Sequence, residues 1–292
     1  MTRTFGEILN TGIKRLADAD IADAKRDAEE LLLHITGESR MFLFMERNKE
    51  ASAEQAERYL ELIEKRASGY PLQYIVGTQE FMGLEFEVNE NVLIPRQDTE
   101  TLVELALEEA KGMKPDLRVL DMCSGSGAIA VSMAHFVPGA QVTACDLSDG
   151  ALEMTRRNAE KNGVADRVTV KKSDMFNVQL SGEAVPLEGG FDMILSNPPY
   201  IETKVIGTLQ TEVKDYEPMM ALDGGDDGLV FYRILAEEAP SRLNENGVLI
   251  MEIGHDQGQS VPELLEKTEK FKNIRVIKDL PGLDRVVYAK LR

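Results

Sequence analysis

The tetrapeptide Asn197-Pro198-Pro199-Tyr200 contains residue types that can hold a planar amide or an exocyclic aromatic amine. The side-chain oxygen of Asn197 and the carbonyl of Pro198 are acceptors for the two N–H groups of such a substrate. Proline adds no competing donor, and the Tyr200 ring can cover the planar group. An amide nitrogen is a weak nucleophile because its lone pair is delocalised, so such a site acts by positioning and electrostatics. The tetrapeptide therefore indicates an enzyme that methylates nitrogen, although a rigid Pro-Pro exit loop would also explain its prolines.

A glycine-rich loop earlier in the chain predicts a nucleotide-type binding site. The segment Asp121-Met122-Cys123-Ser124-Gly125-Ser126-Gly127 follows an apolar strand and leads directly into a helix. Glycines at such a turn let backbone N–H groups approach a ligand. Asp146 comes nineteen residues after Gly127, at the end of the next strand, which is the spacing of an acidic residue that holds a ribose diol. Taken alone, the loop also fits a simple turn or the dinucleotide fingerprint, which leaves an NAD-dependent reductase as an alternative.

Both segments lie where short apolar strands alternate with helices. This alternation predicts a parallel sheet with helices on both faces, in which ligands bind outside the carboxyl ends of the strands. The loop and the tetrapeptide each follow such a strand, so we expect them at the same edge of the sheet. The expected strands cover 118–122, 141–145, 168–172, 191–195, 248–252, 274–277 and 285–289, and the expected helices cover 128–136, 151–162, 229–239 and 261–270.

The first part of the chain has only helical periodicity. Apolar residues recur at helical spacing within 5–16, 28–35 and 53–67, which predicts a small helical bundle. Gly69-Tyr70-Pro71 interrupts this pattern, and residues 81–88 then alternate apolar and charged side chains as a half-exposed strand does. We therefore expect a helical domain over 1–71, a β-hairpin linker over 72–95 and a catalytic domain over 96–292.

The composition is that of a globular protein with a strong acidic bias. The 292 residues include 33 basic and 51 acidic side chains, a net charge of −18, of which −14 falls in residues 81–292. This acidity argues against a protein whose main partner is a nucleic acid backbone. Cys123 and Cys145 lack the spacing of a zinc site, so we expect reduced thiols and no metal. Without an apolar span of about 18 residues or a secretory leader, the expected location is the cytoplasm.

With these motifs in place, the sequence resembles the HemK/PrmC family of release factor glutamine methyltransferases over nearly its whole length. The resemblance implies a Rossmann-like class I methyltransferase domain that uses S-adenosylmethionine, with a mostly parallel seven-stranded sheet, an N-terminal helical bundle that recognises substrate and a hairpin linker. It also implies methylation of the glutamine side-chain amide in the Gly-Gly-Gln motif of peptide chain release factors. We expect a monomer with no direct nucleic acid or membrane partner. Besides the tetrapeptide with Ile201, the resemblance rests on Gly69-Tyr70-Pro71-Leu72-Gln73-Tyr74-Ile75, Ile94-Pro95-Arg96-Gln97-Asp98-Thr99-Glu100, Tyr216-Glu217-Pro218, Ala221-Leu222-Asp223-Gly224-Gly225-Asp226-Asp227-Gly228-Leu229, Glu252-Ile253-Gly254 with Gln257, and Asp284-Arg285-Val286.

Carried over residue by residue, the resemblance implies roles for the site residues. Asn197, Pro198 and Tyr200 are expected to be catalytic, and with Pro199 they would bind the substrate glutamine, whose pocket Arg96 would help to shape. The sequence departs from the family pattern twice, with Cys123-Ser124 in place of the usual Gly-Thr and Met175 where an aromatic residue is common. We expect these departures to alter cofactor affinity without abolishing the chemistry. The residues expected to bind the cofactor are Asp121, Cys123, Ser124, Gly125, Ser126, Gly127, Asp146, Met175 and Asn197.

The sequence leaves two further alternatives to a protein glutamine methyltransferase. A DNA adenine methyltransferase would use the same tetrapeptide on a flipped-out base, but it would need a basic groove and a target-reading domain that the sequence does not show. A non-catalytic cofactor-binding scaffold would be expected to lack Asn197 or Pro198, and both are present. Asp98 and Thr99 are interpreted as capping residues at the start of a helix.

Overall fold

The N-terminal helices are amphipathic and pack around a core of their own. The computed structural model describes residues 3–180 and 183–292. Its first helices are α1 (Phe5–Ala17), α2 (Ala24–Thr36) and α4 (Ala53–Ala67), with the shorter α3 (Arg40–Met45) and α5 (Leu72–Val76). Thr4 and Ser52 start α1 and α4 with capping boxes, each completed by the third residue of its helix. The three predicted helices are confirmed, whereas α3 and α5 were not predicted. The largest fully buried side chains of this core are Ile8, Leu16, Leu31, Leu32, Tyr59 and Ile63.

A short segment from later in the chain belongs to the same compact unit. The chain up to Gly77 forms one unit together with Gln210–Tyr216, and Thr78–Leu209 with Glu217–Arg292 forms the other. The buried guanidinium of Arg66 contacts Asp27 at 2.7 Å and Glu212 at 2.9 Å. The rings of Tyr70 and Tyr216 lie edge to face with centroids 5.0 Å apart. These contacts hold residues 210–216, including α10 (Thr211–Lys214), with the helices, although the sequence placed them within the stretch 96–292.

The expected hairpin is present but shorter than the segment assigned to it. Strands β1 (Thr78–Phe81) and β2 (Leu84–Glu87) form an antiparallel two-stranded sheet. The first part of the stretch 72–95 is instead helix α5, which ends at Gly77 in the left-handed conformation. After the hairpin, the buried side chains of Val88, Val92 and Ile94 anchor the chain before the next helix.

In the part of the chain that the structure describes, the second unit is built on a nine-stranded sheet with the order β10-β11-β9-β8-β3-β4-β5-β6-β7. The five strands from β9 to β5 in that order run parallel, and β10, β11, β6 and β7 pair antiparallel. All seven predicted strands are confirmed. The two additional strands form an edge hairpin that the sequence analysis missed, and the sheet thus exceeds the expected seven. The strands are β3 (Arg118–Met122), β4 (Gln141–Asp146), β5 (Val168–Asp174), β6 (Asn177–Leu180), β7 (Glu183–Pro186), β8 (Phe191–Ser196), β9 (Leu243–Glu252), β10 (Phe271–Lys278) and β11 (Asp284–Leu291).

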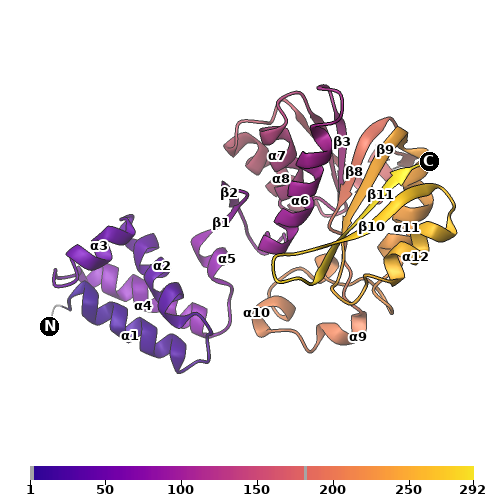
Figure 1. The fold of residues 1–292 in the computed structure, drawn as a ribbon. Coiled ribbons are helices and arrows are strands. Elements are labelled where there is room, and N and C mark those ends of the chain that lie inside the picture. Colours follow the sequence, from indigo (N-terminus) through magenta and orange to yellow (C-terminus); the bar gives the residue numbers. More distant parts are fainter. Residues whose placement is uncertain (1–2, 181–182) are drawn as a thin grey trace. The chain divides into compact units, whose positions relative to one another are not determined.

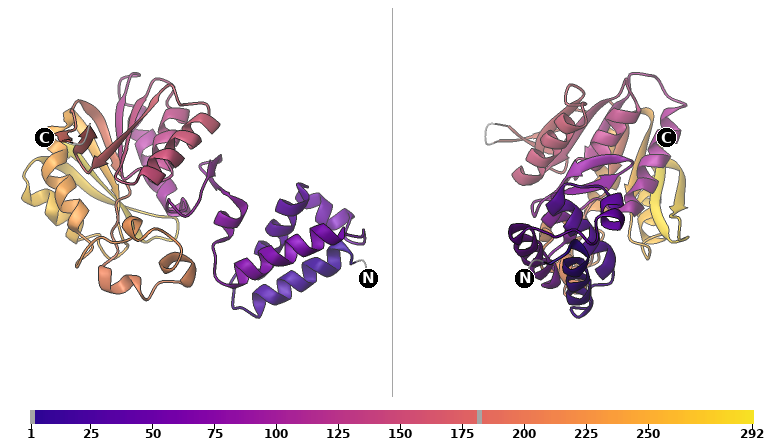
Figure 2. Two further views of the ribbon diagram at one scale, coloured as in Figure 1. Left: turned by 180° about the vertical axis from the view of Figure 1, so that it is seen from behind. Right: turned by 90° about the vertical axis from the view of Figure 1, so that its left-hand side faces the viewer.

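Helices cover both faces of this sheet, as Figures 1 and 2 show. One core joins α6 (Gln97–Ala110), α7 (Ala128–Phe136) and α8 (Asp149–Lys161) to one face, and a second joins α11 (Val230–Glu238) and α12 (Ser260–Lys267) to the other. Neighbouring strand residues alternate between the two cores, as Val119 and Leu120 do, because successive side chains of a strand point to opposite faces. Short helical turns complete the unit: α9 (Thr203–Ile206), η1 (Met219–Ala221) and η2 (Ala239–Ser241). Among the described residues, no helix is both long and apolar enough to cross a membrane.

Candidate active site

The glycine loop, Asp146 and the tetrapeptide meet because β3 lies between β4 and β8. Met122, the last residue of β3, pairs with Cys145 on one side and with Ser196 on the other. The residues that follow these three strand ends therefore lie at one edge of the sheet. The strand order reverses at β3, because β4 and β5 lie on one side of it and β8 and β9 lie on the other. Open parallel sheets bind ligands at such a switch point. The predicted convergence of the motifs is confirmed.

In the loop after β3 every second residue has a positive φ angle, and the loop leaves space for a ligand. Cys123, Gly125 and Gly127 all have positive φ, at 64°, 54° and 80°. A Cβ at Gly127 would come within 2.9 Å of Thr155, whereas a Cβ at Gly125 would meet no atom within 4 Å. Gly127 is therefore required by close packing on α8, and Gly125 lies against open space where a ligand can approach the backbone. The helix α7 begins immediately after this loop, so its first N–H groups lie at the same place.

Two polar residues on α8 hold the loop, and the sequence analysis missed both. The hydroxyl of Thr155 donates to the carbonyl of Gly125 at 3.0 Å, and the amide of Asn158 donates to the carbonyl of Ser126 at 2.9 Å. Both side chains are fully buried. The signal that could have found them is a pair of polar residues, three positions apart, on the buried face of an otherwise amphipathic helix.

Asp146 is held at the end of β4 by the backbone of this loop. Its carboxylate accepts hydrogen bonds from the N–H groups of Gly125 and Ser148, both at 2.9 Å. Burial raises the pKa of Asp146, and the N–H donors around it oppose that rise. Since a carboxylate has about four acceptor positions, further hydroxyl groups can still bind here.

Asp121 has a different place from the other loop residues. It is fully buried in β3, does not line the cavity, and accepts the N–H of Ala130 at 3.0 Å through Oδ2. Its Oδ1 has no hydrogen-bond partner among the described residues. Burial raises the pKa of Asp121 to about 8, opposed by the Ala130 hydrogen bond. The structure therefore places the predicted cofactor residue Asp121 beneath the loop rather than at the cavity wall.

The four residues of the tetrapeptide differ in their position relative to the cavity. Asn197 and Pro199 line the cavity, whereas Pro198 and Tyr200 are not among its lining residues. The side-chain Nδ2 of Asn197 donates to Oγ1 of Thr99 at 3.2 Å. The hydroxyl of Tyr200 donates to Oε1 of Glu252 at 3.2 Å, and its ring packs into the core. The Tyr200 ring therefore packs behind the cavity wall, whereas the sequence analysis expected it to lie over the planar group of the substrate.

Thr99 also differs from its interpretation as a cap. Helix α6 has Arg96 at its N-cap position, and among the described residues no side-chain hydrogen bond caps its N-terminus. Thr99 is the third residue of the helix, is buried, and its hydroxyl oxygen accepts a hydrogen bond from Asn197. The chain after the tetrapeptide is held by Gln257, whose amide donates to the carbonyls of Tyr200 at 3.1 Å and Gly228 at 3.2 Å. Thr99, Glu252 and Gln257 are residues whose part in the site the sequence analysis did not assign.

Arg96 lies at the cavity wall and is tethered there. Its Nη2 contacts Oε2 of Glu217 at 2.5 Å, and the other carboxylate oxygen of Glu217 accepts the N–H of Ile94 at 3.2 Å. The side chain of Glu217 is 1% exposed, whereas that of Arg96 is 41% exposed. The buried carboxylate thus fixes one end of Arg96 and leaves the rest of its guanidinium open to a ligand or solvent.

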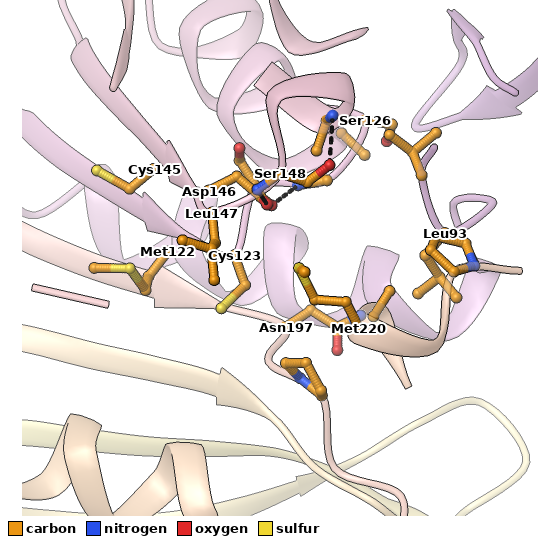
Figure 3. Close-up of a pocket in the computed structure, with 18 of the residues that line it drawn as sticks. Leu93, Met122, Cys123, Ser126, Cys145, Asp146, Leu147, Ser148, Asn197 and Met220 are labelled. Atoms are coloured by element: carbon orange, nitrogen blue, oxygen red, sulfur yellow. Dashed lines mark hydrogen bonds between the residues drawn. The ribbon is translucent and has the colours of Figure 1, made fainter. Parts of the chain in front are cut away.

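These residues surround one cavity of about 260 Å³. That volume far exceeds the roughly 30 Å³ that one water occupies, so the cavity accommodates an organic ligand. Figure 3 shows Cys123, Asp146 and Asn197 around it, from three neighbouring strand ends. Apolar side chains supply much of the remaining wall, and the sequence analysis had not selected them: Leu93, Met122, Ala128, Ile129, Leu147, Met220 and Phe231.

The fold and the site together define a methyltransferase: a parallel sheet with a glycine loop after its first strand, an acidic residue after the second and Asn-Pro-Pro-Tyr after a third. A methyltransferase from Pyrococcus furiosus shares this fold, with a TM-score of 0.50 and 21% identity over 81% of this chain and 98% of that one. The family described as "Methyltransferase small domain" matches residues 98–214, and "PrmC N-terminal domain" matches residues 7–77.

Curated relatives extend the similarity over the full chain. A release factor glutamine methyltransferase of Moorella thermoacetica is 40% identical over 99% of this chain and 99% of its own length. One from Clostridium botulinum is 39% identical over 97% and 98%. The chain belongs to the family of release factor glutamine methyltransferases, and the family resemblance seen in the sequence is confirmed.

Proposed function

We propose that this protein methylates the side-chain amide nitrogen of the glutamine in the Gly-Gly-Gln motif of peptide chain release factors, with S-adenosylmethionine as the methyl donor. The observation that carries the proposal is the position of Asn197 in the same cavity as the glycine loop and Asp146. Family membership supports the choice of a protein glutamine over other amides. The glycine loop and Asp146 suit a nucleotide-type methyl donor, and Asn197 suits an amide. A cavity that contains all of them therefore suits methyl transfer from S-adenosylmethionine to a glutamine side chain.

The described residues fit S-adenosylmethionine in three respects. Gly125 leaves open space beside the loop, so a ligand can contact its backbone. Asp146 retains acceptor positions for ribose hydroxyls, and Met175 lines the cavity with a polarizable sulfur suited to an adenine face. The carboxyl group of Asp146 lines the cavity and can supply negative charge to a cationic ligand, whereas Asp121 lies beneath the loop with its pKa raised to about 8. We propose that Gly125, Asp146 and Met175, with Cys123, Ser124, Ser126 and Gly127, hold the donor.

The chain's own residues act by holding the substrate amide. When bound, S-adenosylmethionine supplies an electrophilic methyl group on a positively charged sulfur. The side-chain oxygen of Asn197 and the carbonyl of Pro198, the residue between the two that line the cavity, accept hydrogen bonds from the two N–H groups of the amide and thereby orient the nitrogen lone pair. Arg96, tethered by Glu217, closes the wall on the substrate side. The methylated amide then sheds one proton, so the site needs no strong base.

The domain roles form part of the same proposal. We propose that the helical unit over 1–71 recognises the release factor, that 72–95 links the two parts, and that 96–292 carries the catalytic site apart from the segment 210–216 that packs with the helices. The match of the "PrmC N-terminal domain" to residues 7–77 supports a role specific to this family.

Mass spectrometry of a purified release factor tests the proposal. After incubation with the protein and labelled S-adenosylmethionine, we expect one added methyl group on the glutamine of Gly-Gly-Gln. A release factor with glutamate at that position serves as the matched control and should remain unmodified. Strong transfer to duplex DNA with none to the release factor would instead support a DNA adenine methyltransferase. Calorimetry that showed binding of NAD in preference to S-adenosylmethionine would support a reductase.

A further inference from the structure

Two consecutive methionines are exposed at the edge of the cavity. Met219 and Met220 belong to the short turn η1, and they are 53% and 55% exposed. Met220 lines the cavity, as Asn197 does, whereas Met219 is not among the lining residues (Figure 3). The pair therefore extends from the cavity wall to the outer surface. The mechanism derived so far uses neither methionine.

The backbone beneath the methionine pair is anchored at both ends. Before the pair, the buried carboxylate of Glu217 accepts the N–H of Ile94 and contacts Arg96 at the cavity wall. After the pair, Leu222 is buried, and its carbonyl accepts the N–H of Ile201 at 3.0 Å. Since Ile201 directly follows the tetrapeptide, η1 is held next to the residues expected to bind the substrate amide. A fixed turn at this place presents two apolar side chains that stay exposed, which is typical of an interaction site.

The segment that surrounds the pair is acidic. Residues 217–229 contain four acidic side chains and no lysine or arginine. Glu217 and Asp227 form ion pairs with arginines elsewhere in the chain, and Asp223 and Asp226 add further negative charge. An apolar contact bordered by carboxylates suits a partner segment that combines an apolar side chain with positive charge.

The place of the pair indicates which part of the substrate would meet it. A glutamine within a protein has chain on both sides, and this chain must stay outside the cavity when the side-chain amide is inside. A residue that both lines the cavity and is exposed, as Met220 is, lies where that chain would pass. Methionine suits such a contact because its flexible, polarizable thioether adapts to the shape of a partner.

We propose that Met219 and Met220 form a docking surface for the segment of the release factor that borders the glutamine, and that this segment carries an apolar side chain and positive charge. The proposal rests on the function proposed above, since it concerns how the same substrate is held. It assigns the pair to binding of the protein substrate and not to the methyl transfer itself. The pair should therefore control KM for the release factor and leave kcat nearly unchanged.

Paired substitutions at the two positions separate apolar contact from shape. Glutamine has nearly the length of methionine but is polar, so the double variant Met219→Gln, Met220→Gln removes the apolar contact. The double variant Met219→Leu, Met220→Leu keeps it. Phe136→Gln is the matched control, because Phe136 is 42% exposed, does not line the cavity and lies at the end of α7 away from the glycine loop.

Steady-state kinetics with a release factor, at saturating S-adenosylmethionine, measures the contribution of the pair. We expect KM to rise about tenfold in the double glutamine variant, equivalent to about 1.4 kcal/mol, with kcat within about threefold of wild type. The double leucine variant and Phe136→Gln should keep both parameters within about threefold of wild type. An unchanged KM in the double glutamine variant would overturn the inference. A weakened Kd for S-adenosylmethionine in calorimetry, with KM for the release factor unchanged, would also overturn it and assign the pair to the donor.

Ionic strength tests the charge of the bound segment. We expect KM for the release factor to rise with salt in the wild type, because salt screens attraction between exposed charges. Asp226→Asn should raise KM at low salt and weaken this dependence, since it removes one carboxylate beside the pair. A wild-type KM that does not respond to salt would show that the segment is not held by positive charge.

NMR detects docking without methyl transfer. With ¹³C-labelled methionine methyl groups, the signals of Met219 and Met220, assigned from the leucine variants, should shift when a release factor is added. If the wild type does not methylate the release factor but these signals shift, the proposed function is wrong and the docking surface stands. If the wild type methylates it while the signals and KM do not respond, the surface is wrong and the function stands. Shifts that follow the concentration of the protein alone would assign the pair to a second copy of this chain and overturn the proposal.

Discussion

The sulfur atoms of Cys123 and Met175 lie 3.9 Å apart at the wall of the cavity. Both residues also have a left-handed backbone conformation, with φ of 64° and 48°, which residues other than glycine rarely adopt. They belong to the two departures from the family pattern, which are Cys123-Ser124 in place of Gly-Thr and Met175 in place of an aromatic residue. The departures are therefore one structural feature, since the cysteine side chain occupies space that Met175 borders.

We predict that Cys123→Gly and Met175→Phe do not act independently on cofactor binding. Glycine relieves the left-handed strain at position 123 and removes the sulfur that Met175 contacts, so the effect of a larger ring at 175 depends on which residue stands at 123. Calorimetry with S-adenosylmethionine on the wild type, both single variants and the double variant should show an interaction of at least about 0.5 kcal/mol. Strictly additive binding energies would contradict the coupling.

Asn197→Ala separates methyl transfer from cofactor binding. We expect kcat for release factor methylation to fall by at least about 100-fold, because the variant lacks a positioned acceptor for the substrate amide. The Kd for S-adenosylmethionine should change little, since the loop and Asp146 remain. Asn177→Ala, an exposed position on β6, provides the control and should retain full activity. An active Asn197→Ala enzyme would refute the proposed mechanism.

The raised pKa of Glu252 predicts how Glu252→Gln changes the pH dependence of stability. Between its ordinary 4.5 and about 7, the native carboxyl keeps a proton that the unfolded chain releases. The free energy of unfolding of the wild type therefore falls as pH rises through this range, and the introduced glutamine has no such proton to lose. The other titratable and charged groups are common to both proteins, so they do not contribute to the difference between them. These groups are Asp121, whose pKa is raised to about 8, and the neighbours of Glu252, which are Asp98, Tyr200, Tyr232 and Arg285.

Urea unfolding at several pH values between about 5 and 8.5 tests this difference. The stability of Glu252→Gln relative to wild type should increase with pH, by up to about 3 kcal/mol across the range. A difference that stays constant with pH would show that Glu252 titrates normally in the native protein.

Arg66→Met should destabilise the helical unit by about 3 kcal/mol. The substitution leaves the buried carboxylate of Asp27 without its contact at 2.7 Å, where burial already raises the pKa of Asp27. It also removes the contact to Glu212 that ties residues 210–216 to the helices. Hydrogen exchange of amides in α2 and α4 measures the effect.

Arg58→Met is the control for the same chemical change at the surface. Arg58 and Glu61 form an exposed pair one turn apart on α4, so its loss should cost less than about 0.5 kcal/mol. Equal losses of protection in the two variants would show that burial of the Arg66 cluster contributes nothing.

The elements that could be predicted are those whose signal is local. The seven strands and the helices between them follow from apolar runs of the right length, and Gly125 and Gly127 mark a turn by residue type alone. Strands β6 and β7 were missed because Asn177–Leu180 and Glu183–Pro186 are only four residues long each, too short for a clear periodic signal. The attachment of residues 210–216 to the helices was missed because it depends on an ion pair and a ring contact with residues 146 positions earlier.

The sequence by itself determined that a glycine loop, Asp146 and Asn197 follow three strands of a parallel sheet, since strand direction brings such ends to one edge. The tertiary structure alone decided what stands behind them. Thr99 is 98 residues from Asn197, and Glu252 is 52 residues from Tyr200. Hydrogen bonds over such separations leave no periodic trace in the chain, because they depend on how α6 and β9 pack against β8. The direction in which Asn197 presents its amide is therefore a property of the folded core.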